Sequence, residues 1–235
     1  MSNAFPGPVL CIVSHPDDEI LGFGATANKF KSSGINVETL IISGQADKRF
    51  NGDKEEILKT RCKKACNLVG IKNVNFGTFP NLSLHNVDSY NIVNFIETSI
   101  KKIKPQTIFT HHPKDLNIDH KVVSELTLAA ARLPQRRPDL QLPLIKNIFF
   151  MEILSSTDWA YANSENFDPN VFISVTENDL NAKVRSLKCY ENVERDRPHP
   201  RNEETIKALA KYRGSQCGKF YAEAFVSCFS LYDSI

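Results

Sequence analysis

Two short polar segments of the chain combine histidine with aspartate, and each directly follows an apolar run. Residues 14–19 read Ser-His-Pro-Asp-Asp-Glu, and residues 111–120 read His-His-Pro-Lys-Asp-Leu-Asn-Ile-Asp-His. Imidazole nitrogens and carboxylate oxygens are good zinc ligands, and a catalytic zinc site combines three protein ligands with one position for water. We therefore predict a hydrolytic metal site whose ligands are His15, Asp18 and His120.

Asp17 lies between two of these ligands in the sequence. A carboxylate beside a metal ion, but not bound to it, can take a proton from the attacking water. We predict that Asp17 is this general base. The alternative is that Asp17 or Asp18 caps a helix that begins near Glu19, although capping explains neither His15 nor the second polar segment.

Two further aspartates of the second segment, Asp115 and Asp119, are expected to orient the imidazoles of the site. Each has an alternative role as the N-cap of the helix that contains His120. A single histidine is more often a hydrogen-bonded structural residue than a metal ligand, so the metal prediction depends on the two segments together.

Short β-branched runs alternate with helical patterns in the first half of the chain, and this order places the polar segments. Strands are expected at residues 9–14, 37–43, 74–76 and 107–110, and helices at 19–33, up to Gly70, and at 89–103. Such repetition predicts an α/β fold with a Rossmann-like, mostly parallel sheet and helices on both faces. Ligands of such sheets bind at the carboxyl ends of the strands, where both polar segments begin.

The second half of the chain is less regular. A helix is expected at residues 119–132, then a proline-rich link, strands at 148–153 and 171–175, two helical patterns and an apolar tail. At 235 residues, 41% of them hydrophobic, the chain is expected to form a single domain over residues 1–235. Residues 1–5 are set aside as a candidate tag remnant or disordered segment.

The charge and the apolar runs limit the partners. The 29 basic and 27 acidic residues are mixed along the chain, which argues against nucleic acid or an anionic membrane as a partner. No apolar run approaches the roughly 20 residues of a membrane-spanning helix, and no signal-peptide pattern begins the chain. We expect a cytoplasmic enzyme without an integral membrane segment, and a homo-oligomer remains open.

The six cysteines contain no CxxC pair, and we expect them to be reduced thiols. Cys11 and Cys228 lie in apolar runs that are typical of buried strands. Cys62 and Cys66 are four residues apart in a helical pattern and can share a helix face. They lack the further cysteine or histidine spacing of a zinc module.

The two polar segments resemble the signature of the PIG-L or LmbE-like family of zinc-dependent N-deacetylases, [A/S]-H-P-D-D-E followed much later by H-x-D-H. The first motif matches fully. The resemblance implies that His15, Asp18 and His120 bind zinc and that Asp17 is the general base. It extends to residues 155–159, 198–201 and 222–225, which are similar to segments of bacterial members. The implied substrate is an acetylated amino sugar or its conjugate, of the N-acetylglucosamine type, including nucleotide- or lipid-linked forms in glycan biosynthesis.

Two positions depart from the family pattern. Asn117 stands where the family usually has a histidine that stabilises the oxyanion or acts as an acid. An amide can donate a hydrogen bond to an oxyanion but carries no proton at neutral pH. Asp17 therefore becomes the leading candidate for both base and acid, and His199 is the second candidate for the acid. Asn81 replaces a frequent aspartate and is expected to contact substrate hydroxyls.

Two arginines complete the candidate substrate-binding residues. Arg49 follows the second expected strand, where it could bind a phosphate or a sugar hydroxyl or remain a solvated loop residue. Arg201, beside His199, could bind substrate or form a simple ion pair. Two other functions stay open: an amidase acting on a non-sugar or thiol conjugate, and a non-catalytic sugar-binding protein that contains a metal. Another divalent cation could also replace zinc.

Overall fold

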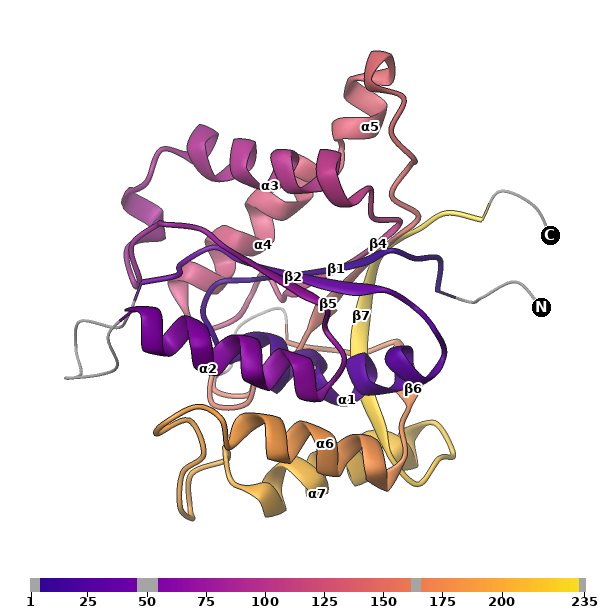
Figure 1. Ribbon diagram of the computed structural model, residues 1–235. Helices are drawn as coiled ribbons and strands as arrows, with labels where there is room; N and C mark the ends of the chain where they lie inside the picture. The colour runs from indigo at the N-terminus through magenta and orange to yellow at the C-terminus, as the bar shows by residue number, and fades with distance from the viewer. Residues whose placement is uncertain (1–4, 46–54, 162–165, 233–235) are drawn as a thin grey trace.

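The computed structural model describes residues 5–45, 55–161 and 166–232 (Figure 1). Seven strands form one sheet in the order β3-β2-β1-β4-β5-β7-β6. The strands are β1 (Val9–Val13), β2 (Val37–Ile41), β3 (Asn73–Phe76), β4 (Thr107–His111), β5 (Asn147–Met151), β6 (Val171–Ser174) and β7 (Ala222–Ser230). The helices are α1 (Asp18–Ser32), α2 (Glu55–Leu68), α3 (Ser89–Ile103), α4 (Ile118–Ala131), α5 (Leu133–Arg136), α6 (Glu177–Leu187) and α7 (Glu203–Gln216), with short 3-10 turns η1 (Leu84–Asn86) and η2 (Pro138–Leu140).

The sheet has a point at which the direction of winding changes. Strands β1 to β5 are parallel, and β1 pairs with β2 on one side and with β4 on the other. The chain therefore winds outward from β1 in one direction through β2 and β3, and then returns to start the other direction at β4. Such a switch leaves a crevice at the carboxyl ends of the two central strands, which is the usual ligand site of this architecture.

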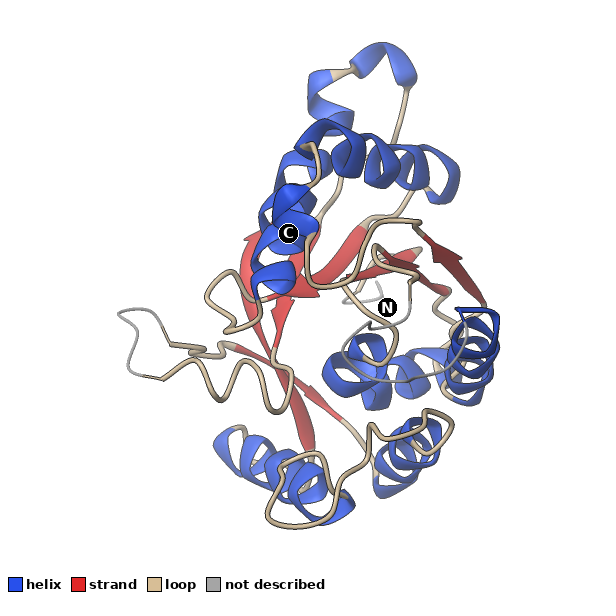
Figure 2. Ribbon diagram, turned by 90° about the vertical axis from the view of Figure 1, so that its left-hand side faces the viewer, coloured by secondary structure: helices blue, strands red, loops and turns tan. Residues whose placement is uncertain are grey.

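Apolar side chains cover both faces of the sheet, as expected for parallel strands buried between helices. In β1, Val9, Cys11 and Val13 join a core with α1, α2 and α6, whereas Leu10 and Ile12 join a second core with α3 and α4. Figure 1 shows these two groups of helices on opposite sides of the strands, and Figure 2 shows the same layers from the side. The predicted single α/β domain with a mostly parallel sheet is confirmed.

The apolar tail forms β7, which inserts antiparallel between β5 and β6. Within the described part of the chain, β6 pairs with residues 222–225 of β7, and these four residues are buried. Beyond them β7 has β5 as its strand neighbour, and its last three residues are exposed. Cys228 is therefore exposed, which corrects the expectation that it is buried, whereas Cys11 is buried as expected.

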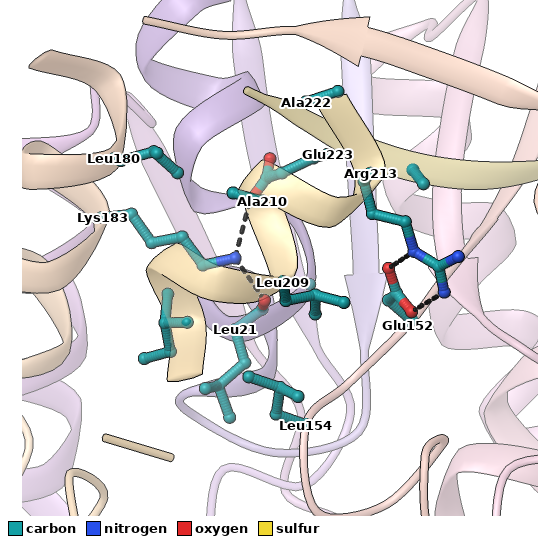
Figure 3. Close-up of a pocket in the computed structure, with 13 residues that line it drawn as sticks. Leu21, Glu152, Leu154, Leu180, Lys183, Leu209, Ala210, Arg213, Ala222 and Glu223 are labelled. Atoms are coloured by element: carbon teal, nitrogen blue, oxygen red, sulfur yellow. Dashed lines mark hydrogen bonds and ion pairs between the residues drawn. The ribbon is translucent and has the colours of Figure 1, made fainter. Parts of the chain in front are cut away.

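One buried and one partly buried ion pair fix β7 and the last two helices to the rest of the fold (Figure 3). Lys183 of α6 lies 2.6 Å from the Glu223 carboxylate of β7 and donates to the Leu21 carbonyl of α1 at 2.6 Å. Arg213 of α7 forms two hydrogen bonds, of 2.9 and 2.7 Å, to the carboxylate of Glu152. The cavity between these pairs measures about 20 Å³, room for about one water molecule.

The amino-terminal segment corrects one expectation. Phe5 is partly buried and packs against Phe30 and Phe149, with ring centroids 5.2 and 5.8 Å away, so this residue is ordered against the core. Residues 1–4 lie outside the described part of the chain. Among the described residues, no helix has the length and apolar character needed to cross a membrane.

Candidate metal centre and catalytic base

The turn after β1 carries two of the predicted ligands. Asp18, the first residue of α1, is 1% exposed, and its Oδ2 atom lies 3.4 Å from Nδ1 of His15. The same oxygen accepts a hydrogen bond from the backbone N–H of His15 at 3.0 Å. β1 and β4 are neighbouring parallel strands, so this turn lies at the switch point of the sheet, where such folds have their ligand crevice.

The third predicted ligand comes from the helix that follows β4. His120, in the first turn of α4, is 1% exposed and places Nε2 3.2 Å from Asp18 Oδ2. One ligand atom from each of His15, Asp18 and His120 lies within 4.8 Å of the other two. Two imidazole nitrogens and a carboxylate oxygen that converge in this way suit a divalent ion such as zinc.

A carboxylate lies behind each imidazole of this group. Asp119 Oδ2 is 3.0 Å from His15 Nε2, and Asp119 also accepts backbone N–H bonds from Leu82 and Leu84. Asp115 Oδ2 is 3.2 Å from His120 Nδ1. Such carboxylates fix the rotation of a ligand histidine and raise its basicity. Both rings therefore present their remaining nitrogen to Asp18.

Asp115 is itself held by hydroxyl groups. Ser156 donates to its Oδ1 and Thr157 donates to its Oδ2 at 2.7 Å, and both come from the loop that follows β5. The carboxylate also accepts the backbone N–H of Asn117 at 2.9 Å. The loop after β5 therefore also contributes to the site, because its hydroxyl groups hold Asp115.

The charges of the group favour a cation in the crevice. Burial lowers the pKa of His120, but the charge of Asp18 and the contact with Asp115 outweigh it and raise the pKa to about 10. Burial raises the pKa of Asp18, yet the charge of His120 and the hydrogen bonds with His120 and His15 hold it well below its usual range. The carboxylates thus stabilise positive charge between them, whether a proton or a metal ion provides it.

Asp17 has an unusual backbone conformation that turns its side chain away from helix capping. Its φ is 117°, a region that a residue with a side chain rarely adopts. Its N–H donates to Glu19 Oε2 at 3.0 Å, and its carbonyl accepts the N–H groups of Ile20 and Leu21. The Asp17 carboxylate forms no cap hydrogen bond, so the capping alternative does not account for it.

The Asp17 carboxylate faces a cation instead. Arg201 Nη1 lies 3.2 Å from Asp17 Oδ2, and the guanidinium is held in place by a 3.0 Å bond from its Nε to the Leu154 carbonyl. Burial raises the pKa of Asp17 to about 6, and the charge of Arg201 opposes this rise. A carboxyl group with such a pKa can accept and return a proton near neutral pH.

Asn117 is the N-cap of α4. Its Oδ1 accepts the backbone N–H of Asp119 at 2.9 Å, so Asn117, rather than Asp115 or Asp119, has the capping role. Because the cap uses the oxygen of the side-chain amide, the amide NH₂ group remains available as a donor. The cap also fixes the start of α4 and so the position of His120.

The predicted substrate-binding residues fall into different places. Asn81 belongs to the loop that bonds to Asp119, and its Oδ1 is buried without a hydrogen-bond partner among the described residues. His199 accepts the backbone N–H of Arg201 at 3.1 Å, one step behind the guanidinium that faces Asp17. Arg49 lies outside the described residues.

Two neighbours of the site were not among the residues predicted for it. The ring of His111 stacks on that of His120 with centroids 3.8 Å apart, and its Nε2 accepts the Ser14 N–H at 2.8 Å. Burial and the charge of His120 lower its pKa to about 3, so His111 is neutral. Trp159 packs edge-on against His199 at 5.5 Å. His111 could have been suspected from its place at the end of β4, whereas nothing local linked Trp159 to His199.

Comparison with known proteins bears on this site. The family model PIG-L, described as GlcNAc-PI de-N-acetylase, matches residues 10–131. The chain is 25% identical to diacetylchitobiose deacetylase of Thermococcus kodakarensis, over 92% of this chain and 80% of the relative. It is 28% identical to a probable N-acetyl-alpha-D-glucosaminyl L-malate deacetylase 2 of Bacillus cereus, over 68% of this chain and 77% of that protein.

The fold is also similar to that of an enzyme with a different activity. The 4-carboxy-2-hydroxymuconate hydratase of Pseudomonas putida KT2440 superposes with a TM-score of 0.78 at 16% identity, over 97% of this chain and 99% of the hydratase. The fold therefore does not by itself select the reaction. The reaction must therefore be inferred from the side chains in the crevice.

Proposed function

The chain belongs to the PIG-L family of de-N-acetylases, and from this premise we propose that it is a metal-dependent hydrolase that removes the acetyl group from an acetylated amino sugar. One observation carries the proposal: the carboxylate of Asp17, outside the ligand group, adjoins the convergence of His15, Asp18 and His120. A metal ligand set with an adjacent base of pKa about 6 is suited to hydrolysis.

The residues divide the work as follows. His15, Asp18 and His120 would hold a divalent ion, zinc in our proposal, and when bound it supplies Lewis acidity that polarises a carbonyl and makes water more acidic. Asp17 takes the proton of the attacking water. It then returns this proton to the amide nitrogen as the C–N bond breaks, which leaves acetate and a free amine.

The second polar segment stabilises the negative charge that develops on the carbonyl oxygen. The NH₂ group of Asn117 is the proposed donor, because its oxygen is already bonded to the Asp119 N–H. Asp119 and Asp115 keep the two ligand imidazoles in position. His111 is neutral and buried, so its ring packs against His120 without adding charge.

Arg201 holds the base. Its 3.2 Å contact with Asp17 and its bond to the Leu154 carbonyl fix the carboxylate. This is a different role from direct substrate binding, which we leave to Asn81, His199 and Arg49. The unpartnered Oδ1 of Asn81 suits a hydroxyl donor of a sugar.

The proposed substrate class follows from the relatives. The two curated relatives are named as deacetylases of an N-acetylated disaccharide and of an N-acetylglucosaminyl conjugate. We propose that this chain acts on N-acetylglucosamine-type substrates. The exposed indole of Trp159, beside His199, offers an apolar face against which a sugar ring can stack.

Acetate release tests the proposal. Purified protein is incubated with N,N′-diacetylchitobiose, N-acetylglucosaminyl malate and UDP-N-acetylglucosamine, with and without a chelator, and N-acetylcysteine is the non-sugar control. We expect chelator-sensitive acetate release from at least one sugar, restored by added zinc. Release from N-acetylcysteine alone would favour a non-sugar amidase. No chelator-sensitive release from any acetylated compound would overturn the enzyme assignment.

A further inference from the structure

A second group of candidate ligands lies on the side of the Asp17 turn that faces α2. Glu19 is in the first turn of α1, and Cys62 and Cys66 are one turn apart on α2. All three side chains are completely buried. Each can offer one ligand atom, and these three atoms lie within 4.8 Å of one another.

The distances in this group suit a tetrahedral ion. The sulfur atoms of Cys66 and Cys62 lie 3.5 and 3.8 Å from Glu19 Oε1. Zinc bonds of about 2.3 Å to sulfur and about 2.0 Å to oxygen, at a tetrahedral angle, separate such ligand atoms by roughly 3.5 Å. Each sulfur therefore lies at about the distance from the carboxylate oxygen that an ion between them requires, and the two sulfur atoms lie within 4.8 Å of each other.

The two oxygens of Glu19 have separate partners. Oε1 faces Cys62, Cys66 and the hydroxyl of Tyr190, which donates to it. Oε2 instead accepts the N–H of Asp17 at 3.0 Å. An ion bound at Oε1 therefore leaves the bond to the Asp17 turn in place.

We propose that Glu19, Cys62 and Cys66 form a second metal site for zinc or another thiophilic divalent ion, with Tyr190 beside its fourth position. Binding replaces the thiol protons of Cys62 and Cys66, which pass to solvent, because the thiolate is the ligand. The ion then carries two thiolates and one carboxylate. Thiolate ligands are typical of structural zinc, and the complete burial of all three side chains shields the fourth position from solvent.

The site joins α1 to α2 directly behind the strained Asp17. It differs from the crevice in chemistry, since the crevice offers imidazole and carboxylate and this group offers sulfur. The sequence pattern does not predict this site, because the third ligand, Glu19, comes from a different helix, 43 positions before Cys62. This inference does not depend on the deacetylase activity.

Metal content and cobalt spectra test the second site. Because the group is buried, the ion is supplied during expression, in medium containing zinc or, in parallel, cobalt. We expect two ions per chain in the wild-type protein and one in Cys62→Ser/Cys66→Ser. Cys189→Ser/Cys217→Ser is the matched control and should keep two, since these cysteines lie outside the group.

The cobalt protein adds a signal that only sulfur ligands give. Thiolate ligation of cobalt produces a strong charge-transfer band in the near ultraviolet, and the imidazole and carboxylate ligands of the crevice do not. The band should persist in His120→Ala and disappear in Cys62→Ser/Cys66→Ser. One ion per wild-type chain without the band overturns the proposal, even if the double cysteine variant does not fold.

Discussion

Two clusters of buried charge in this molecule have opposite characters. Around α6, α7 and β7, the carboxylates of Glu223 and Glu152 accept hydrogen bonds from protein donors. Glu223 accepts them from Lys183 and from two backbone N–H groups of α1, and Glu152 accepts them from Arg213. In the crevice, the nitrogens of His15 and His120 both point at one oxygen of Asp18. In the first cluster, protein donors satisfy the carboxylate acceptors. In the second, the ligand atoms of several side chains converge on one place.

Burial alone does not distinguish a cluster that stabilises the fold from one that has a function. Both clusters place ionisable groups in the interior, where unpaired charge costs several kcal/mol. Matched donors and acceptors stabilise a fold, but converging acceptors call for a cation from outside the chain. Changes in the crevice should therefore alter turnover, and changes in the ion-pair cluster should alter stability.

Replacing the base should give the largest effect and is the strictest test of this division. In Asp17→Asn the amide cannot accept the proton, so we expect turnover to fall about 10³-fold with the metal content unchanged. Acetate release and metal analysis on the same sample measure the two quantities. Asp139→Asn, an exposed aspartate paired with Arg137, is the control. A variant that loses its metal and keeps full activity per bound ion would contradict the role of Asp17.

Breaking the ion-pair cluster should show the reverse pattern. Lys183→Met leaves the Glu223 carboxylate buried without its cation, so the free energy of unfolding should fall by about 3–5 kcal/mol. Denaturant titration measures this change, and kcat per folded molecule should remain that of the wild type. Lys188→Met removes an exposed pair with Glu203 and should cost at most about 1 kcal/mol. Equal losses in the two variants would remove the distinction between the clusters.

Asn117 caps α4 and is also the proposed oxyanion donor, and two substitutions separate these two roles. Asn117→Asp keeps the cap oxygen but removes the NH₂ donor, so stability should hold while kcat falls about 10²-fold. Asn117→Ala loses both and should also lose about 1 kcal/mol of stability. Thermal melts and steady-state kinetics give the two readouts. Wild-type kcat in Asn117→Asp would place Asn117 outside the reaction.

The smallest expected effect is a shift in the pH dependence of kcat/KM. Asp17 acts as a base only when ionised, so activity should be present above its pKa and be lost as pH falls through it. Burial raises this pKa to about 6, and a bound divalent ion lowers it, so the acidic limb should lie at or below about pH 6. Arg201→Gln removes a charge that lowers the pKa and should move the limb upward. A limb that moves downward would show that Arg201 does not act on Asp17.

The sequence supported the fold better than the contacts between distant segments. His15 and Asp18 are three residues apart after a strand, and His120 follows the strand beside it, so their meeting follows from local pattern and the parallel sheet. The α/β fold was predicted from the same strand and helix pattern, and the family from the resemblance of the two polar segments to its signature. The insertion of β7 was not, because an apolar tail does not reveal which strands it pairs with.

The contacts that could not be predicted from the sequence join residues that lie far apart in the chain. Arg201 meets Asp17 across 184 positions, and no periodicity relates the two. Cys62 and Cys66 were seen as a pair without a third ligand, since Glu19 reaches them only after α1 and α2 pack together. Nothing in the composition distinguished Arg201 from an arginine in an ordinary surface ion pair.

The place of β7 in the sheet also sets the order in which the molecule can be assembled during synthesis. Strands β1 to β5, and with them the ligand crevice, can pair as the chain emerges, but β6 lies at the edge of the described sheet and pairs there with β7. Until β7 is made, β5 presents an open edge that can pair with another chain. A nascent chain stalled before residue 222 is therefore expected to carry a nearly finished active site on a fold still prone to aggregate.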